Sequence, residues 1–119
     1  MTHIRRSADC GNSPKNGLAE DVAVALETRG VDVLTPILDP EVEWHHPNGV
    51  VTSARSVADQ VAIGVAPNSV TIDHVVSHGK VAAVNGTTER GQGERRFCHV
   101  LVFTSTTFKK VRRIESFDG

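Results

Sequence analysis

Two histidines in strand-forming surroundings are the residues of this sequence best suited to proton-transfer chemistry. His46 ends a short stretch of strand-forming residues, and His99 stands within a later apolar run. An imidazole titrates near neutral pH, so it can take a proton from one atom of a ligand and return it to another. A second imidazole in a dry pocket can stabilise an enolate-like charge through its N–H group. The sequence therefore predicts His46 and His99 as catalytic candidates, with the alternative that each is a hydrogen-bonded pocket or core histidine.

Further side chains are predicted to line a pocket with these histidines. Trp44, the only tryptophan, alternates onto the same strand face as Val42 and His46. There it either stacks on a flat ligand or fills the core without one. The other ligand-binding candidates are on later strands, where most share a face with apolar neighbours: His74, Asn85, Leu101, Phe103 and Phe117. Such a lining predicts an apolar pocket for a small apolar ligand.

Metal and cofactor chemistry has no recognisable motif in this sequence. The chain has six histidines but no HxH or HExxH spacing. The adjacent His45 and His46 point to opposite faces of a strand, so they are poorly placed to share a metal ion. There is no Gly-rich phosphate loop and no GxSxG sequence. We therefore expect no metal and no cofactor.

Composition and charge are those of a soluble globular domain. The chain has 119 residues, 39% of them hydrophobic and 23% charged, and its formal net charge is -1. The near-neutral balance argues against nucleic acid or a membrane surface as a partner, and no apolar run approaches the length of a membrane span. Of the two cysteines, Cys10 lies in a polar segment and Cys98 in an apolar run, without a CxxC pair. A cytoplasmic location is expected.

Three helices are predicted in the first half of a single domain, 14–119, after a flexible leader, 1–13. The first helix should run from Pro14 to Gly30, with Ser13 as N-cap and a stripe of leucine, valine and alanine residues. A short second helix is predicted over residues 33–38. A strand over 41–46 and a Pro-Asn-Gly turn follow. A third helix, with its capping box at Ser56, should present Val57, Val61 and Val65.

Four antiparallel strands are predicted after these helices, at about residues 70–77, 81–89, 97–104 and 109–117. This order of elements predicts an α+β fold. On the third of these strands Cys98, Val100 and Val102 alternate with residues that are also mostly apolar. Three short helices cover one face only, so the second face should meet another surface, most simply in a homodimer through Cys98, Val100 and Val102.

Four stretches together resemble the SnoaL-like and ketosteroid isomerase-like branch of the nuclear transport factor 2-like superfamily. They are GVDVL with LDPEVEW, then HPNG, then HGKVAAVNG, and finally FCHVLVF with IESF, which places the resemblance over about residues 16–118. It implies a cone-shaped, curved antiparallel sheet wrapped on N-terminal helices, as in cystatin-like α+β barrels. The fold hosts isomerases, cyclases, hydrolases, dehydratases and noncatalytic modules.

The resemblance also suggests roles for the two histidines. Ketosteroid isomerases have an Asp-Pro step whose aspartate is the general base, and His46-Pro47 stands in the similar place here. They also have a protonated aspartate before an apolar-x-x-Phe run, and His99 precedes Val100-Leu-Val-Phe103 in the same way. This chain has no tyrosine to match their tyrosine donor.

Two functional hypotheses follow from these patterns. The first is a small-molecule-binding domain with an apolar pocket, acting as a cofactor-free isomerase, cyclase or hydratase with His46 as general base. The second is a noncatalytic, dimeric ligand-binding or protein-interaction module. The sequence leaves the ligand, the pathway and the role of residues 1–13 open.

Overall fold

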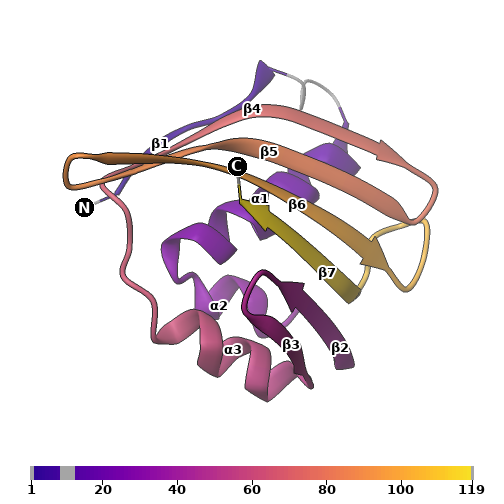
Figure 1. Cartoon of the computed structure of the whole chain (residues 1–119). Helices are drawn as coiled ribbons and strands as arrows, with labels where there is room; N and C mark the ends of the chain where they lie inside the picture. The colour runs from indigo at the N-terminus through magenta and orange to yellow at the C-terminus, as the bar shows by residue number, and fades with distance from the viewer. Residues whose placement is uncertain (1, 9–12, 119) are drawn as a thin grey trace.

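The computed structural model of the chain describes residues 2–8 and 13–118. Within them, three helices cover the concave side of a curved, open sheet of seven strands (Figure 1). The predicted α+β class is confirmed. The elements are, in chain order, β1 His3–Arg5, α1 Pro14–Thr28, α2 Val31–Leu34, β2 Leu38–His46, β3 Gly49–Thr52, α3 Ala54–Ala62, β4 Ser69–His78, β5 Val81–Arg90, β6 Gly93–Phe103 and β7 Val111–Asp118.

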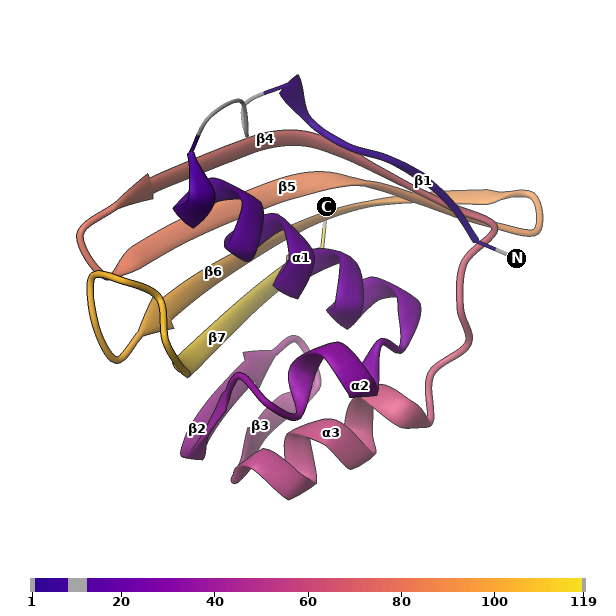
Figure 2. The ribbon, with the colours of Figure 1, turned by 180° about the vertical axis from the view of Figure 1, so that it is seen from behind.

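The strands follow the order β1-β4-β5-β6-β7-β2-β3 across the sheet. The long strands β4 to β7 pair antiparallel, as predicted, whereas β1 pairs with β4 and β2 pairs with β7 in parallel. Seen from behind, α1 crosses the concave face of the long strands, and α2 and α3 lie near β2 and β3 (Figure 2). The parallel β2–β7 pair joins the early strand to the end of the chain.

Local capping explains where the helices begin. Ser13 caps α1 by accepting a hydrogen bond from the backbone N–H of Asn16 at 3.2 Å, as predicted. The helix α2 begins at Val31, two residues before its predicted start, with Gly30 as N-cap. The helix α3 is capped by Ser53 rather than by Ser56, because the Ser53 hydroxyl accepts the Ser56 N–H at 3.2 Å. The helix ends at Ala62, with Ile63 as C-cap, so Val65 lies outside it and is 76% exposed.

Two short strands were not predicted from the sequence. β3 forms a hairpin with β2 around the predicted Pro-Asn-Gly turn. β1 lies within the segment 1–13 that was expected to be a flexible leader, and its residues pair with Ser69, Val70 and Thr71 of β4. Residues 9–12, which include Cys10, lie outside the described residues.

A bulge in β4 changes which of its side chains face the helices. The pairing with β5 shifts between Ile72 and His74, so Asp73 is an extra residue on this strand. As a result Ile72 and Val75 are buried, whereas His74 and Val76 are exposed. The uninterrupted alternation that placed His74 beside Ile72 is therefore wrong.

Aromatic side chains fill one end of the concave side. The rings of Phe103 and Phe108 stack with centroids 3.8 Å apart, and both residues are almost fully buried. Leu101 is 0% exposed and belongs to the same core. Leu101 and Phe103 therefore belong to the hydrophobic core. The space that remains on the concave side is near the C-terminal end of α1.

Within the described residues, no helix combines the length and the apolar character that crossing a membrane requires.

Candidate functional site

Four side chains from four elements form a hydrogen-bonded chain on the concave side of the sheet. Trp44 on β2 donates its indole N–H to Ser116 Oγ on β7 at 2.8 Å. Ser116 Oγ lies 2.7 Å from Nδ1 of His99 on β6, and Nε2 of His99 lies 2.7 Å from Oε2 of Glu27 on α1. His99 is 3% and Glu27 6% exposed, so the Glu27–His99 contact is shielded from water. We call this set the Trp44–Glu27 chain.

Strand register explains why these residues meet. β6 and β7 pair His99 directly with Ser116. β2 and β7 pair Trp44 with Ile114, which is two residues from Ser116 and therefore on the same face of β7. The side chains of paired residues lie on the same face of a sheet. Glu27 reaches His99 because it lies in the last turn of α1, and α1 crosses this face of the sheet (Figure 2). Segments more than 70 residues apart in the sequence thus converge on one site.

Arginines surround the carboxylate at the end of the chain. Arg95 donates to Glu27 Oε1 at 3.0 Å through one guanidinium nitrogen and to Asp118 Oδ1 at 2.6 Å through another. Arg90 contributes a second positive charge near Glu27 and donates a hydrogen bond to the carbonyl of Val65. Two carboxylates and two guanidinium groups therefore balance in formal charge around this site.

Burial alone would raise the pKa of Glu27, but the hydrogen bond from His99 and the positive charges of Arg95 and Arg90 reverse that effect. The net result is a pKa below the ordinary value of 4.5, so Glu27 is ionised at neutral pH. An ionised carboxylate accepts hydrogen bonds only, so His99 donates through Nε2–H. In the neutral ring Nδ1 then accepts the Ser116 hydroxyl proton, and every polar group of the Trp44–Glu27 chain has a partner.

His46 is oriented by the turn that follows it. Its Nδ1 accepts a hydrogen bond from the backbone N–H of Asn48 at 3.3 Å, and its ring lies 5.0 Å from the Trp44 ring. A nitrogen that accepts an N–H carries the lone pair, so the proton of neutral His46 is on Nε2. This Nε2 is buried and has no hydrogen-bond partner among the described residues.

A cavity opens beside these groups at the unfilled end of the concave side. Its volume is about 220 Å³, and Trp44, His46, His99, Ser116 and Glu27 all line it. It adjoins a second hollow of about 450 Å³ that shares Trp44 and Glu27 and extends along α3. Both hollows also contact Gln60, Arg90 and Arg95. The lining is more polar than the apolar wall expected from the sequence.

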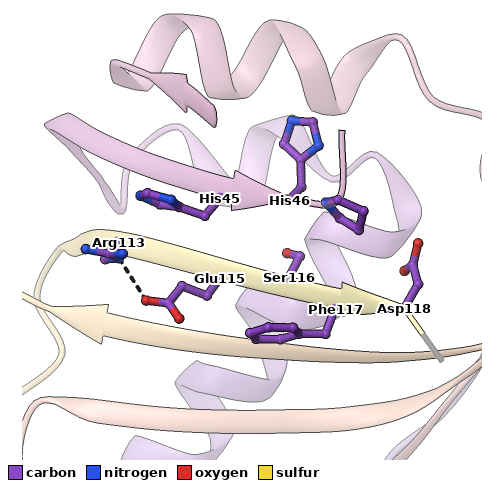
Figure 3. Close-up of a pocket in the computed structure, with 8 residues that line it drawn as sticks. His45, His46, Arg113, Glu115, Ser116, Phe117 and Asp118 are labelled. Atoms are coloured by element: carbon purple, nitrogen blue, oxygen red, sulfur yellow. Dashed lines mark ion pairs between the residues drawn. The ribbon is translucent and has the colours of Figure 1, made fainter. Parts of the chain in front are cut away.

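A separate groove of about 420 Å³ lies between β2 and β7 and extends onto the outer face of the sheet (Figure 3). Its outward-facing lining combines the charged Arg113 and Glu115 with the rings of His45 and Phe117. Arg113 Nε donates to Glu115 Oε2 at 2.8 Å, and Phe117 is 53% exposed. In Figure 3 His46 projects away from the side of β2 that carries His45. His46 and Ser116 line both this groove and the inner cavity.

The structure brings together three of the residues predicted from the sequence: Trp44, His46 and His99. The other five are elsewhere. His74 and Asn85 pair with each other across β4 and β5, and Asn85 and Phe117 both pair with Cys98, which puts all three on the outer face. Leu101 and Phe103 lie on the inner face but inside the core.

Glu27, Arg95 and Ser116 complete the site and were not predicted. Taken alone, a glutamate on a helix is expected to face solvent. Glu20 and Glu27, however, are seven residues apart and both lie on the buried face of α1. A pair of acids on an apolar helix stripe is the signal that could have revealed it, because a buried carboxylate needs a partner. Within the described residues, no group of three or more His, Cys, Asp or Glu side chains could hold a metal ion.

Comparisons with known proteins bear on the fold. No protein-family model matches the sequence, and no curated protein matches it. A ketosteroid isomerase-like protein of Kribbella flavida superposes with a TM-score of 0.74 at 17% identity, over 87% of this chain and 76% of that chain. An NTF-2 like protein of unknown function from Burkholderia xenovorans gives 0.72 at 10%, over 88% and 84%. TerC, crystallised with polyporic acid, gives 0.69 at 15%, over 90% and 92%.

Proposed function

We propose, from the premise that this chain has the nuclear transport factor 2-like fold, that it binds a small molecule in the cavity beside Trp44 and His46. The ligand would place a hydrogen-bond acceptor at His46 and a flat, less polar part against Trp44. Cofactor-free proton transfer of the isomerase, cyclase or hydratase type is the chemistry that this site would serve. The observation that carries the proposal is the buried, unpartnered Nε2 of His46.

A buried donor without an acceptor is unfavourable by about 1–3 kcal/mol, so native structures rarely retain one that neither water nor a ligand satisfies. His46 Nε2 has no acceptor among the described residues, yet its residue lines the cavity. A ligand oxygen would remove this penalty. A carbonyl is a suitable group, because it accepts hydrogen bonds and carries no charge that must be desolvated.

The balanced charges around the cavity favour a ligand without net charge. Glu27 and Asp118 face Arg95 and Arg90, and Arg95 bonds to both carboxylates. These arginines are therefore partly neutralised before any ligand enters. We therefore expect small ketones and enones to bind more tightly than carboxylates or phosphates.

The hydrogen bond from Asn48 favours a donor role for His46 in proton transfer. In that role Nε2–H would stabilise the negative charge that develops on a carbonyl oxygen when a neighbouring carbon loses a proton. If Nε2 acted as general base, as proposed from the sequence, neutral His46 would carry its proton on Nδ1. Two N–H donors, Nδ1–H and the Asn48 N–H, would then face each other and the hydrogen bond between them would be lost. The ionised Glu27 carboxylate lines the same cavity and is the remaining candidate for the base, but its lowered pKa and its bonds to His99 and Arg95 make it a weak one.

Titration with small ketones and enones tests ligand binding, with the fluorescence of Trp44, the only tryptophan, as the signal. His46→Ala should weaken binding about 3- to 10-fold, since one hydrogen bond contributes about 0.5–1.5 kcal/mol. His45→Ala is the matched control, because the adjacent ring projects from the other face of β2 and should leave affinity unchanged. Absence of any Trp44 response up to millimolar ligand, or equal affinity of the His46 variant, would refute the proposal.

A second candidate function, a dimeric interaction module, is supported by the outer face of the sheet. Cys98, Val100 and Val102 are half-buried there, and Phe117, Val76 and Val81 are 53%, 60% and 42% exposed. Apolar side chains on several neighbouring strands of one face are typical of a protein–protein contact. We propose that a second copy of the chain covers this face.

Val100→Lys should then produce monomers or aggregates, because a charge at the centre of an apolar contact must be desolvated. Light scattering of the unmodified protein should give the mass of a dimer at micromolar concentration. Val33→Lys is the control, since Val33 is 52% exposed on α2, away from the outer face. A stable monomer of the unmodified protein under these conditions would rule out the homodimer.

A further inference from the structure

We propose that Ser116, His99 and Glu27 form a nucleophile–base–carboxylate triad, and that Ser116 accepts the acyl group of a small, uncharged ester bound in the cavity. The inference rests on the proposed function in one respect, namely that the cavity binds a carbonyl ligand with its oxygen at His46. It goes beyond that function because it adds a covalent step at a residue to which the proton-transfer proposal gives no role.

Both contacts of the triad are short and join the two nitrogens of one ring. Ser116 Oγ lies 2.7 Å from Nδ1 of His99, and Glu27 Oε2 lies 2.7 Å from Nε2. These separations are within the reach that a nucleophile–base pair and a base–carboxylate pair require. Because the ionised Glu27 accepts a hydrogen bond from Nε2–H, Nδ1 presents its lone pair to the Ser116 hydroxyl. The ring is thus held in the tautomer that can accept the serine proton.

Burial makes the carboxylate effective. His99 and Glu27 are almost fully enclosed, so the attraction between an imidazolium and the Glu27 carboxylate is weakly screened by water. Arg95 holds the second oxygen of Glu27 and leaves Oε2 fixed toward the ring. A protonated His99 would therefore be stabilised as soon as Ser116 loses its proton.

Two N–H donors are adjacent to the nucleophile. Trp44 donates its indole N–H to Ser116 Oγ, where it would stabilise developing alkoxide character. His46 lies on the neighbouring strand and lines the same two spaces as Ser116, the cavity and the outer groove. Its unpartnered Nε2–H is the available donor for the oxyanion of a tetrahedral intermediate.

The reaction balances with water as the only co-reactant. Ser116 Oγ bonds to the carbonyl carbon while its proton passes to Nδ1 of His99, and the carbonyl oxygen becomes the oxyanion at His46. Collapse breaks the bond to the leaving oxygen, which takes the proton from Nδ1 and departs as an alcohol. Water then attacks the acyl-serine, gives its proton to Nδ1, and the carboxylic acid is released as Ser116 regains that proton.

Acetyl transfer from 4-nitrophenyl acetate tests the triad directly. The full chain should release nitrophenolate in a burst and gain the mass of one acetyl group, which peptide mass spectrometry should locate at Ser116. Ser116→Ala should remove both the burst and that adduct. Ser77→Ala is the matched control and should retain them. Ser77 lies on β4, which β5 and β6 separate from β7, and its Oγ donates a hydrogen bond to Asn16 on α1.

A second variant guards against effects on folding. Ser116→Cys keeps a side chain of similar size beside His99, and its thiol should react with iodoacetamide faster than the same thiol in the Ser116→Cys, His99→Gln double variant. An ordinary thiol is only a few per cent thiolate at pH 7, so full ionisation by His99 should raise the alkylation rate by up to about 30-fold. Equal rates in the two proteins, or acetylation confined to lysines and the N-terminus, would overturn the proposal.

The ketone titration separates this proposal from the proposed function. Ketones that bind and change Trp44 fluorescence, together with no acetylation of Ser116, would overturn the triad and leave the binding function standing. Absence of ketone binding together with acetylation of Ser116 would overturn the binding function as stated while supporting the triad.

Discussion

Replacing Glu27 with alanine is expected to lower the free energy of unfolding by about 3–5 kcal/mol, which is a large part of the stability of a domain of this size. The substitution leaves the buried His99 without its acceptor and removes one of the two carboxylates that hold Arg95. It also opens a space beneath α1 where a side chain that is 6% exposed now packs. Urea denaturation followed by circular dichroism measures the change.

The chain contains a matched control for this variant in a second Glu–His pair. Glu43 Oε1 lies 3.0 Å from Nε2 of His45, but the two side chains are 46% and 33% exposed. Water screens and replaces such a surface contact, so Glu43→Ala should change stability little. Equal losses in the Glu27 and Glu43 variants would contradict a special role for the buried pair.

The same carboxylate gives the stability a defined pH dependence. The pKa of Glu27 is lower in the folded chain than its ordinary value of 4.5, because His99, Arg95 and Arg90 outweigh the effect of burial. The folded state therefore gains stability from Glu27 that is fully present above pH 4.5 and is lost as pH falls through the lowered pKa. The difference in unfolding free energy between the unmodified protein and Glu27→Gln should shrink over that acidic range.

Gly86→Ala is expected to destabilise the protein by about 3 kcal/mol, at the upper end of the range for overpacking. Gly86 lies on β5 opposite Ile72, where the β4 bulge begins. An added Cβ would collide with the carbonyl oxygen of Thr71 and approach Cζ of Phe97 to 2.9 Å. The Thr71 oxygen is backbone in a paired strand, so it has little freedom to move. Thermal and urea denaturation measure the loss.

Gly17→Ala provides the contrast within the same chain. Gly17 is in α1, and a Cβ there meets no atom within 4 Å. Alanine in a helix is favoured over glycine by roughly 0.5–1 kcal/mol, so this variant should be as stable as the unmodified protein or slightly more stable. A tolerated Gly86→Ala would show that β4 and β5 separate more easily than their close approach indicates.

The long strands and the first helix could be predicted because their signals are local. Alternating apolar residues mark β5 and β6, and the Ser13-Pro14 step marks the start of α1. β3 has four residues and only one that is not exposed, so it carries no periodic signal. β1 is held by pairing with β4, more than sixty residues later, which a local pattern does not record.

The candidate site was predictable in part for the same reason. Trp44, His46 and His99 were found because alternation along two strands places them on the inner face. Glu27 and Ser116 were missed because their importance arises from contacts across 72 and 17 residues of sequence, which depend on how α1 crosses the sheet and how β6 pairs with β7. An apolar pocket was predicted because the charged residues that line the cavity, such as Glu27, were not recognised in the sequence.

The bulge at Asp73 has a consequence for how relatives of this chain should be compared. Inner-face residues before the bulge occupy even positions, as in Val70 and Ile72, and those after it occupy odd positions, as in Val75. A homologue that lacks the extra residue would have the two halves of the strand in the same phase. Column-by-column alignment without a gap at Asp73 would then equate outward residues with inward ones. Insertion or deletion of a single residue at this point is a simple evolutionary route for exchanging the side chains that line the sheet.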